Sequence, residues 1–275
     1  MTGSPDPTHV SALVRAAVAL TTSDGTPVEV WELRVDPDAS YMAPWASGFR
    51  QHYCDDSEID QLREGTGLSR SEYLTQLVFP DEHAPPGPSI RSGDFAELLI
   101  SDFVEHVLGY WVPRDKFAEK GVRNESVKGV DIVGFRLPAP SSPAASDVLI
   151  AFEVKAQLTD GQYSGRLQVA IDDSAKDFLR RAETLNASKR RLRRAGNKDG
   201  AQIVQRFQNP TDHPYEYRSG AAAVLSGAAY DAGSIQATTD ASQHPNKPRL
   251  QLLVVSGDEL MRLAHSLYKA AADEA

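Results

Sequence analysis

The stretch DVLIAFEVKAQL, residues 147–158, decides the fold, because it has the pattern of an enclosed strand that ends in two opposite charges. Five apolar residues follow Asp147, as is typical of a strand buried on both faces. Glu153 and Lys155 then come two residues apart. Side chains two apart on a strand project from the same face, so both are expected on the face that carries Leu149.

A carboxylate and an ammonium at the end of a buried strand are costly unless something uses them. The alternative is an edge strand whose polar face meets water, and a Glu-x-Lys pattern alone does not distinguish the two. Asp131 favours the interpretation in which Glu153 and Lys155 form a functional site. It lies at the start of the preceding predicted strand, VDIVGFR (130–136), although aspartate is a poor strand former. If the two strands pair antiparallel, Asp131 lies near Glu153, and two carboxylates beside a lysine suit a hard cation such as Mg²⁺.

A helix is predicted over GDFAELLISDFVEHVL, with Ser92 or Asp94 as its cap and Gly109 just past its end. Positions 97, 100, 101, 104 and 108 share one face of this helix, which is mostly apolar. Glu97 lies near the N-terminal end of that face. It is a candidate site residue, and the alternative is a first-turn glutamate favoured by the helix dipole.

Composition indicates an ordinary soluble globular protein of 275 residues, 41% hydrophobic and 24% charged. No apolar run approaches the roughly 20 residues that a membrane span needs, and the N-terminus does not resemble a secretory signal. A cytoplasmic protein is expected, with its single cysteine, Cys54, packed in the core. The net charge is −9, yet residues 176–206 hold ten Lys/Arg against three Asp/Glu, a local balance of +7.

The segment FPDEHAPPGPS, residues 79–89, holds four prolines and a glycine and predicts a boundary. It divides the chain into an N-terminal α/β subdomain, 1–88, which could dock a partner, and a larger domain, 89–275. Within the first part we expect a disordered tail (1–9), a hairpin (10–35) and helices (41–78). In the second, WVPRDKF is a candidate strand, and one long helical pattern follows residue 165, with Leu167, Ile171, Phe178, Ala182 and Leu185 as its apolar stripe.

The ordered set GDFAELL, VKGVDIVGF and LIAFEVKAQL resembles the PD-(D/E)xK nuclease superfamily over roughly residues 92–185. These segments are most similar to those of the nuclease subunit of Hachiman-type antiphage defence systems, where the resemblance extends to AIDDSAKDF (170–178). One departure is Val130, which replaces the proline before Asp131. The resemblance implies an α/β (α+β) fold: a restriction-endonuclease-like mixed central sheet flanked by helices, with an N-terminal α/β extension.

The resemblance also implies roles for individual residues. Asp131 and Glu153, helped by the carbonyl of Val154, would ligate Mg²⁺, with Mn²⁺ as a possible substitute. Lys155 would position and help deprotonate the attacking water, or steady the charge on the phosphate. Glu97 would hold a metal-bound water or a second ion.

DNA and a helicase subunit encoded nearby are the partners that the resemblance implies, and no membrane is expected. The basic segment after the core strand could contact phosphates, because Lys/Arg contacts supply sequence-independent affinity. Its alternative is a solvated helix end. The candidate DNA-binding residues are Gln168, Lys189, Arg190, Arg191, Arg193 and Arg194.

Two other functions remain open. The chain could be a catalytically silent nuclease-fold subunit that docks a partner or DNA. It could also hydrolyse small phosphate esters, which leaves the basic segment unexplained. A histidine-based metal site is not expected, because the seven histidines show no pair at metal-ligand spacing.

Overall fold

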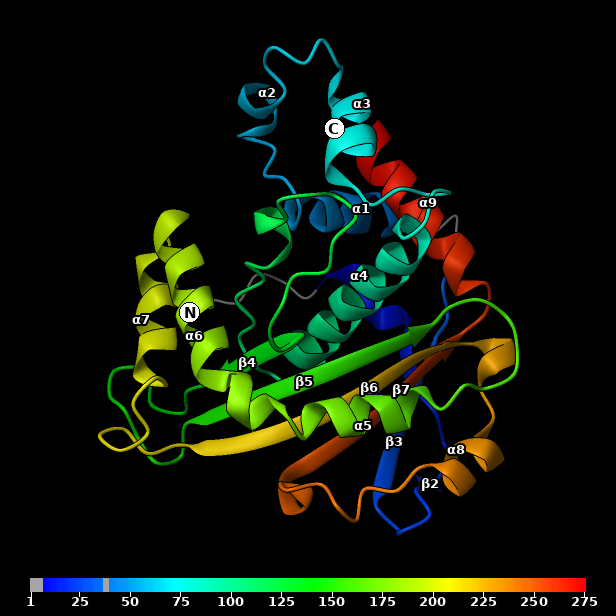
Figure 1. The fold of residues 1–275 in the computed structure, drawn as a ribbon, viewed down its shortest axis with the longest axis vertical. Helices are drawn as coiled ribbons and strands as arrows, with labels where there is room; N and C mark the ends of the chain where they lie inside the picture. Colours follow the sequence, from blue (N-terminus) through cyan, green and yellow to red (C-terminus); the bar gives the residue numbers. More distant parts are fainter. Residues whose placement is uncertain (1–6, 37–39) are drawn as a thin grey trace.

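The computed structural model describes residues 7–36 and 40–275, which form a central sheet covered by helices on both faces (Figure 1). Its strands are β1 (Leu13–Arg15), β2 (Leu20–Thr21), β3 (Pro27–Leu33), β4 (Ile132–Arg136), β5 (Val148–Gln157), β6 (Glu216–Ser226) and β7 (Leu250–Gly257). Its α-helices are α1 (Met42–Gln51), α2 (Ile59–Leu62), α3 (Arg70–Tyr73), α4 (Gly87–Asp102), α5 (Arg166–Ser174), α6 (Asp177–Arg194), α7 (Lys198–Arg206), α8 (Ala232–Thr238) and α9 (Leu260–Asp273). Short 3-10 or π-helical turns include η1 (Thr8–Ala12), η2 (Leu74–Val78), η3 (Phe103–Val107) and η4 (Phe117–Glu119).

The sheet is mixed, with strand order β1-β3-β7-β6-β5-β4 and β2 beside β3. The inner strands β3, β7, β6 and β5 run parallel, and antiparallel partners close both edges. Parallel strands need both faces covered, which explains their nearly continuous apolar sequences. The predicted mixed sheet flanked by helices is confirmed.

The two faces of β5 pack against different helices. Ile150, Phe152 and Val154 lie in the core that includes side chains of α1, α4 and α9. Leu149 and Ala151 lie in the core that includes α6 and α7. The predicted alternation along β5 is therefore confirmed, and it directs Glu153 and Lys155 toward the layer formed by α5 and α6.

The β4–β5 hairpin is antiparallel as predicted, with Ile132 opposite Phe152. This register brings the residue before β4, Asp131, next to Glu153. On the other side of β5, Gly220 of β6 lies against the ring of Phe152, where a Cβ atom would stand 2.5 Å from ring carbons. A glycine is needed there, because any side chain would displace the strand that carries the site.

The predicted start of the helix before Gly109 is wrong. Helix α4 begins at Gly87 after the cap residue Pro86, with a proline in its first turn, so neither Ser92 nor Asp94 is its cap. Proline is favoured there because its fixed φ suits a helix start. Glu97 consequently lies in the middle of the helix, which removes the first-turn explanation. Gly109 does follow the helical segment, with φ of +72°.

The long helix predicted after residue 165 is two helices, because the chain breaks between Ser174 and Asp177. Leu167, Ile171 and Leu185 of the expected apolar stripe are buried, whereas Phe178 is 58% exposed and Ala182 is exposed. The break changes the direction of the helix axis between α5 and α6, so the two helices cannot share one continuous apolar stripe.

Two further predictions need correction. WVPRDKF is not a strand: Trp111 forms one isolated bridge with Phe135, and Arg114 has a positive φ of 49° that ends extended structure. Residues 1–6 of the expected tail lie outside the described part, but Thr8 begins η1 and His9 is buried against Trp45. The predicted hairpin over 10–35 forms, with β2 and β3 as its antiparallel strands.

The first 88 residues contribute strands to the common sheet, since β3 pairs with β7 and α1 packs against α9. Leu13, Leu33 and the apolar side chains of α1 share one core with β5. A division at residue 88 stays a prediction. Among the described residues, no helix combines the length and apolarity that crossing a membrane requires.

Candidate active site

Asp131 is held at the sheet edge by two contacts. Its Oδ2 accepts a hydrogen bond of 2.9 Å from the backbone N–H of Val154, the residue between Glu153 and Lys155. Its Oδ1 lies 3.5 Å from the Nζ of Lys116. The carboxylate is thus fixed beside the end of β5, where the pairing of β4 with β5 predicts it.

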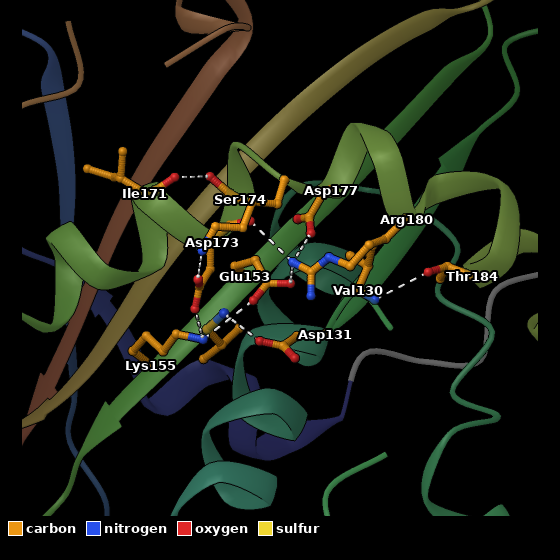
Figure 2. A network of polar contacts seen from close by, with 12 residues as sticks. Val130, Asp131, Glu153, Lys155, Ile171, Asp173, Ser174, Asp177, Arg180 and Thr184 are labelled. Atoms are coloured by element: carbon orange, nitrogen blue, oxygen red, sulfur yellow. Dashed lines mark hydrogen bonds and ion pairs between the residues drawn. The ribbon is translucent and has the colours of Figure 1, made fainter. Parts of the chain in front are cut away.

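Glu153 projects into the layer of α5 and α6, where it meets the start of α6 (Figure 2). Its side chain is 3% exposed, and its Oε1 accepts a hydrogen bond of 3.1 Å from Arg180. The same guanidinium bonds the Asp177 Oδ1 at 2.6 Å. Asp177 is fully buried, and its second oxygen, Oδ2, has no hydrogen-bond partner in the described part of the chain.

Lys155 lies at the exposed side of this cluster. Its Nζ is 2.9 Å from the Asp173 carboxylate and 3.5 Å from that of Glu153. The Lys155 side chain is 24% exposed, and those of Asp173 and Arg180 are 31% and 36% exposed. A ligand from solvent therefore meets these three groups before it reaches the buried carboxyls of Glu153 and Asp177.

The buried carboxyls favour their protonated forms. Burial, followed by the charges of Asp131 and Asp177, raises the pKa of Glu153 to about 9. Burial, with Asp131 contributing, raises the pKa of Asp177 to about 6. Burial disfavours the charged form of Lys155, but Asp173, Asp131 and Glu153 outweigh it and raise the lysine pKa. The site thus has more negative groups than its own cations stabilise.

Glu97 reaches Asp131 only through a lysine. The Glu97 carboxylate lies 2.7 Å from the Nζ of Lys116, which in turn contacts Asp131. Helix α4 covers the sheet face opposite to the one that carries Glu153. Burial raises the pKa of Glu97 to about 8, although the Lys116 ammonium opposes this shift.

The donors suit a hard divalent cation. Burial and the nearby charge of Asp131 raise the pKa values of the Glu153 and Asp177 carboxyls, and the Asp177 Oδ2 has no hydrogen-bond partner among the described residues. Residues 7–36 and 40–275 contain no group of three His, Cys, Asp or Glu side chains arranged to hold a metal. A cation would therefore bind two of these carboxylates and retain waters, which is the preference of Mg²⁺.

The predicted DNA-binding residues do not join this cluster. Gln168 on α5 bonds Asp172 and the backbone of Asp240. The basic residues 189–194 lie in the last two turns of α6. Arg190, Arg193 and Arg194 are exposed, whereas Arg191 is partly buried and lies 3.6 Å from Asp115, and Lys189 bonds Gln208.

A sequence model of the HamA family matches residues 9–271, nearly the whole chain. The chain belongs to the HamA family. Searches of curated proteins and of solved structures give no match. Membership of the HamA family makes this an antiphage defence protein, and the matched range contains every residue of the acidic cluster.

Four residues of this HamA-family site escaped prediction: Lys116, Asp173, Asp177 and Arg180. The last three come from AIDDSAKDFLR, where the spacing of four and three residues would place them on one helix face. That signal was present in the sequence. Lys116 carries no local signal, because its position depends on the loop that leads into β4.

Glu153→Gln is expected to raise the melting temperature of the metal-free protein at pH 8. The folded state raises the Glu153 pKa from 4.5 to about 9, so it binds more protons than the unfolded state between those values. The free energy of unfolding therefore falls as pH rises through this window, and glutamine removes that loss. A gain of about 1 kcal/mol corresponds to about 2–4 °C.

Calorimetry in EDTA at pH 5 and pH 8 checks this expectation. The gain should shrink toward pH 5, where wild-type Glu153 keeps its proton. Asp172→Asn, which changes an exposed carboxylate on α5, serves as the control and should show no gain. If Glu153→Gln instead has a lower melting temperature than wild type at pH 8, the raised pKa of Glu153 in the folded state would be contradicted.

Proposed function

We propose that this HamA-family chain is a Mg²⁺-dependent nuclease that hydrolyses phosphodiester bonds of DNA, working beside a helicase partner in antiphage defence. The single observation that carries the proposal is the cluster at the ends of β4 and β5. There Asp131 is bonded to the backbone beside Glu153, and Lys155 projects from the same strand face as Glu153. This set of residues is the one that the PD-(D/E)xK resemblance requires.

Asp131 and Glu153 would hold the cation, with the carbonyl of Val154 nearby. When bound, a divalent cation lowers the pKa of a water and offsets charge on the scissile phosphate. The chain itself contributes the orientation of its ligands. The backbone N–H of Val154 fixes the rotation of the Asp131 carboxylate, and the pairing of β4 with β5 fixes its distance from Glu153.

Lys155 is suited to the role of a charged donor. Its pKa is raised by neighbouring carboxylates, so at neutral pH it carries an ammonium and no free lone pair. Such a group cannot take a proton, but it can hold a water by hydrogen bonding and stabilise a phosphate oxygen as charge develops. Of the two roles that the resemblance implies, the electrostatic one agrees with this environment.

The exposed arginines at the end of α6 would bind the DNA backbone away from the cleaved bond. Arg190 and Arg194 follow Asp177 by 13 and 17 residues. A helix rises 1.5 Å per residue, so these arginines lie roughly 20–25 Å along α6 from the acidic cluster. That span equals about six to seven base pairs of B-DNA at 3.4 Å each.

Replacing Arg190, Arg193 and Arg194 with alanine together should weaken DNA binding and flatten its salt dependence. Three lost phosphate contacts reduce the slope of log K against log salt by about 2–3. The matched control removes three other exposed cations, Arg15, Arg262 and Lys269, which lie on β1 and α9. Equal slopes for the two triple variants would show that the end of α6 is no DNA-binding surface.

The proposed activity is tested with plasmid and with linear single-stranded DNA, in Mg²⁺ or EDTA, with and without the helicase encoded beside this chain. DNA cleavage that requires Mg²⁺ is the expected result. Cleavage only when the chain and its proposed helicase partner are mixed would show that the partner gates the activity.

Two observations favour a silent docking subunit instead: Arg180 occupies a Glu153 oxygen, and no three-ligand group is preformed in the described residues. Absence of cutting in every mixture, with DNA or partner binding intact, would support that function.

A further inference from the structure

Lys116 is a buried lysine with an unusual position. Its residue is 9% exposed, yet it precedes η4 in a surface segment that crosses the edge of the sheet. Its ammonium bridges the Glu97 carboxylate at 2.7 Å and the Asp131 carboxylate at 3.5 Å. Burying an ammonium costs several kcal/mol unless it is paired, so the two carboxylates account for its place.

The bridge divides the acidic residues into two groups. Glu97 belongs to α4, on one face of the sheet, while Glu153 and Asp177 lie on the other face. Asp131 stands at the edge between them, bonded to the Val154 N–H through Oδ2 and facing Lys116 through Oδ1. A second divalent cation shared by Glu97 and Asp131 would need the space that the ammonium fills.

We propose that the Lys116 ammonium substitutes for a second metal ion, so that this site binds a single divalent cation through Asp131 and Glu153. The inference rests on the proposed nuclease function and specifies its metal requirement. Lys116 is a positioning residue: it neutralises the outer oxygen of Asp131 and anchors it to α4 through Glu97. The cost of burying Glu97 is met by the same ion pair.

A neighbouring pair supplies the matched control. Lys120 lies four residues later in the same segment and pairs with Asp94, which is also a carboxylate of α4. Both lysines are largely buried, at 11% and 4% side-chain exposure. Lys120 also lies near the ring of Tyr53, and no contact joins it to Asp131. Removing either lysine takes the cation away from a buried carboxylate, although Asp94 keeps its hydrogen bond from the Tyr53 hydroxyl. Only Lys116 has a proposed role beside the metal.

The test is Mn²⁺ binding to the full-length chain, followed by electron paramagnetic resonance, for wild type, Lys116→Ala and Lys120→Ala. Surface binding is subtracted with Asp131→Asn. Wild type and Lys120→Ala are expected to hold one Mn²⁺ per chain that Asp131→Asn loses. Lys116→Ala, with the ammonium removed and its space open, is expected to hold two. In Lys116→Ala, the order of the cleavage rate in metal-ion concentration should rise from one to two.

Glu97→Gln keeps the experiment decisive if Lys116→Ala does not fold. If the Lys116 ammonium substitutes for a second ion, as proposed, wild type and Glu97→Gln should each bind one Mn²⁺. If wild type binds two and Glu97→Gln binds one, Glu97 ligates a second ion; the proposal is then overturned, and the nuclease function stands. If Lys116→Ala folds and binds one Mn²⁺, the proposal is also overturned. If wild type binds no Mn²⁺ that depends on Asp131, the metal centre itself is refuted.

Discussion

Lys155→Met is expected to slow Mg²⁺-dependent DNA cleavage by about 10²- to 10³-fold, the usual effect of removing one donor that stabilises developing charge. The Lys155 ammonium lies at the exposed side of the cluster, 3.5 Å from Glu153 and 2.9 Å from Asp173. Methionine keeps the length of the side chain but removes its charge. Single-turnover cleavage at saturating enzyme measures the effect without a contribution from DNA affinity.

Lys176→Met is the matched control for this variant. Lys176 also contacts Asp173, at 2.8 Å, but its side chain is 63% exposed, and the ion-pair partners of Glu153 in the described residues are Lys155 and Arg180. It should cleave at close to the wild-type rate. If both lysine variants lost activity equally, the loss would come from Asp173 and the general field, and Lys155 would have no special role.

Asp131→Asn is expected to lower cleavage by about 10³-fold, because a metal ion supplies several kcal/mol of transition-state stabilisation. Asparagine can still accept the Val154 N–H bond that holds Asp131, now 2.9 Å long, so the β4–β5 hairpin should remain folded. What it loses is the negative charge that binds the cation. Rates measured across a Mg²⁺ titration should show weaker metal binding as well as a lower maximum.

The control for Asp131→Asn is Asp147→Asn at the opposite end of the same hairpin. Asp147 is buried and paired with Arg206, so its replacement should lower the melting temperature. Its cleavage rate per folded molecule should not change. An Asp131→Asn protein that cleaves at the wild-type rate and with wild-type metal affinity would exclude Asp131 from the metal centre.

Local periodicity predicted the part of the site that lies on strands. Alternation along β5 is a geometric property of the extended chain, so Glu153 and Lys155 were placed on one face without knowledge of the fold. Antiparallel pairing then placed Asp131 correctly beside Glu153. These inferences needed only neighbouring segments joined by one loop.

The remainder depended on contacts between distant segments. Lys116 joins α4 to the start of β4, and nothing in WVPRDKF indicates that its lysine is buried. Asp177 and Arg180 share a helix-face spacing with Asp173, but that spacing does not show that the face packs against β5, and the chain also breaks after Ser174. The prolines before α4 resemble a linker in sequence, but Pro86 and Pro88 begin the helix, so its start lies earlier than the predicted caps.

We propose above that the start of β4 and the end of β5 form a metal-dependent site that cleaves phosphodiester bonds. The most direct measurement compares wild type, Glu153→Gln, Lys155→Met and Lys176→Met, each with the proposed helicase partner and linear DNA in Mg²⁺, at equal concentrations of folded protein. We predict cleavage by wild type and Lys176→Met, and a loss of at least about 10²-fold in the other two. Cleavage at wild-type rates by Glu153→Gln and Lys155→Met would place the activity elsewhere and contradict the account.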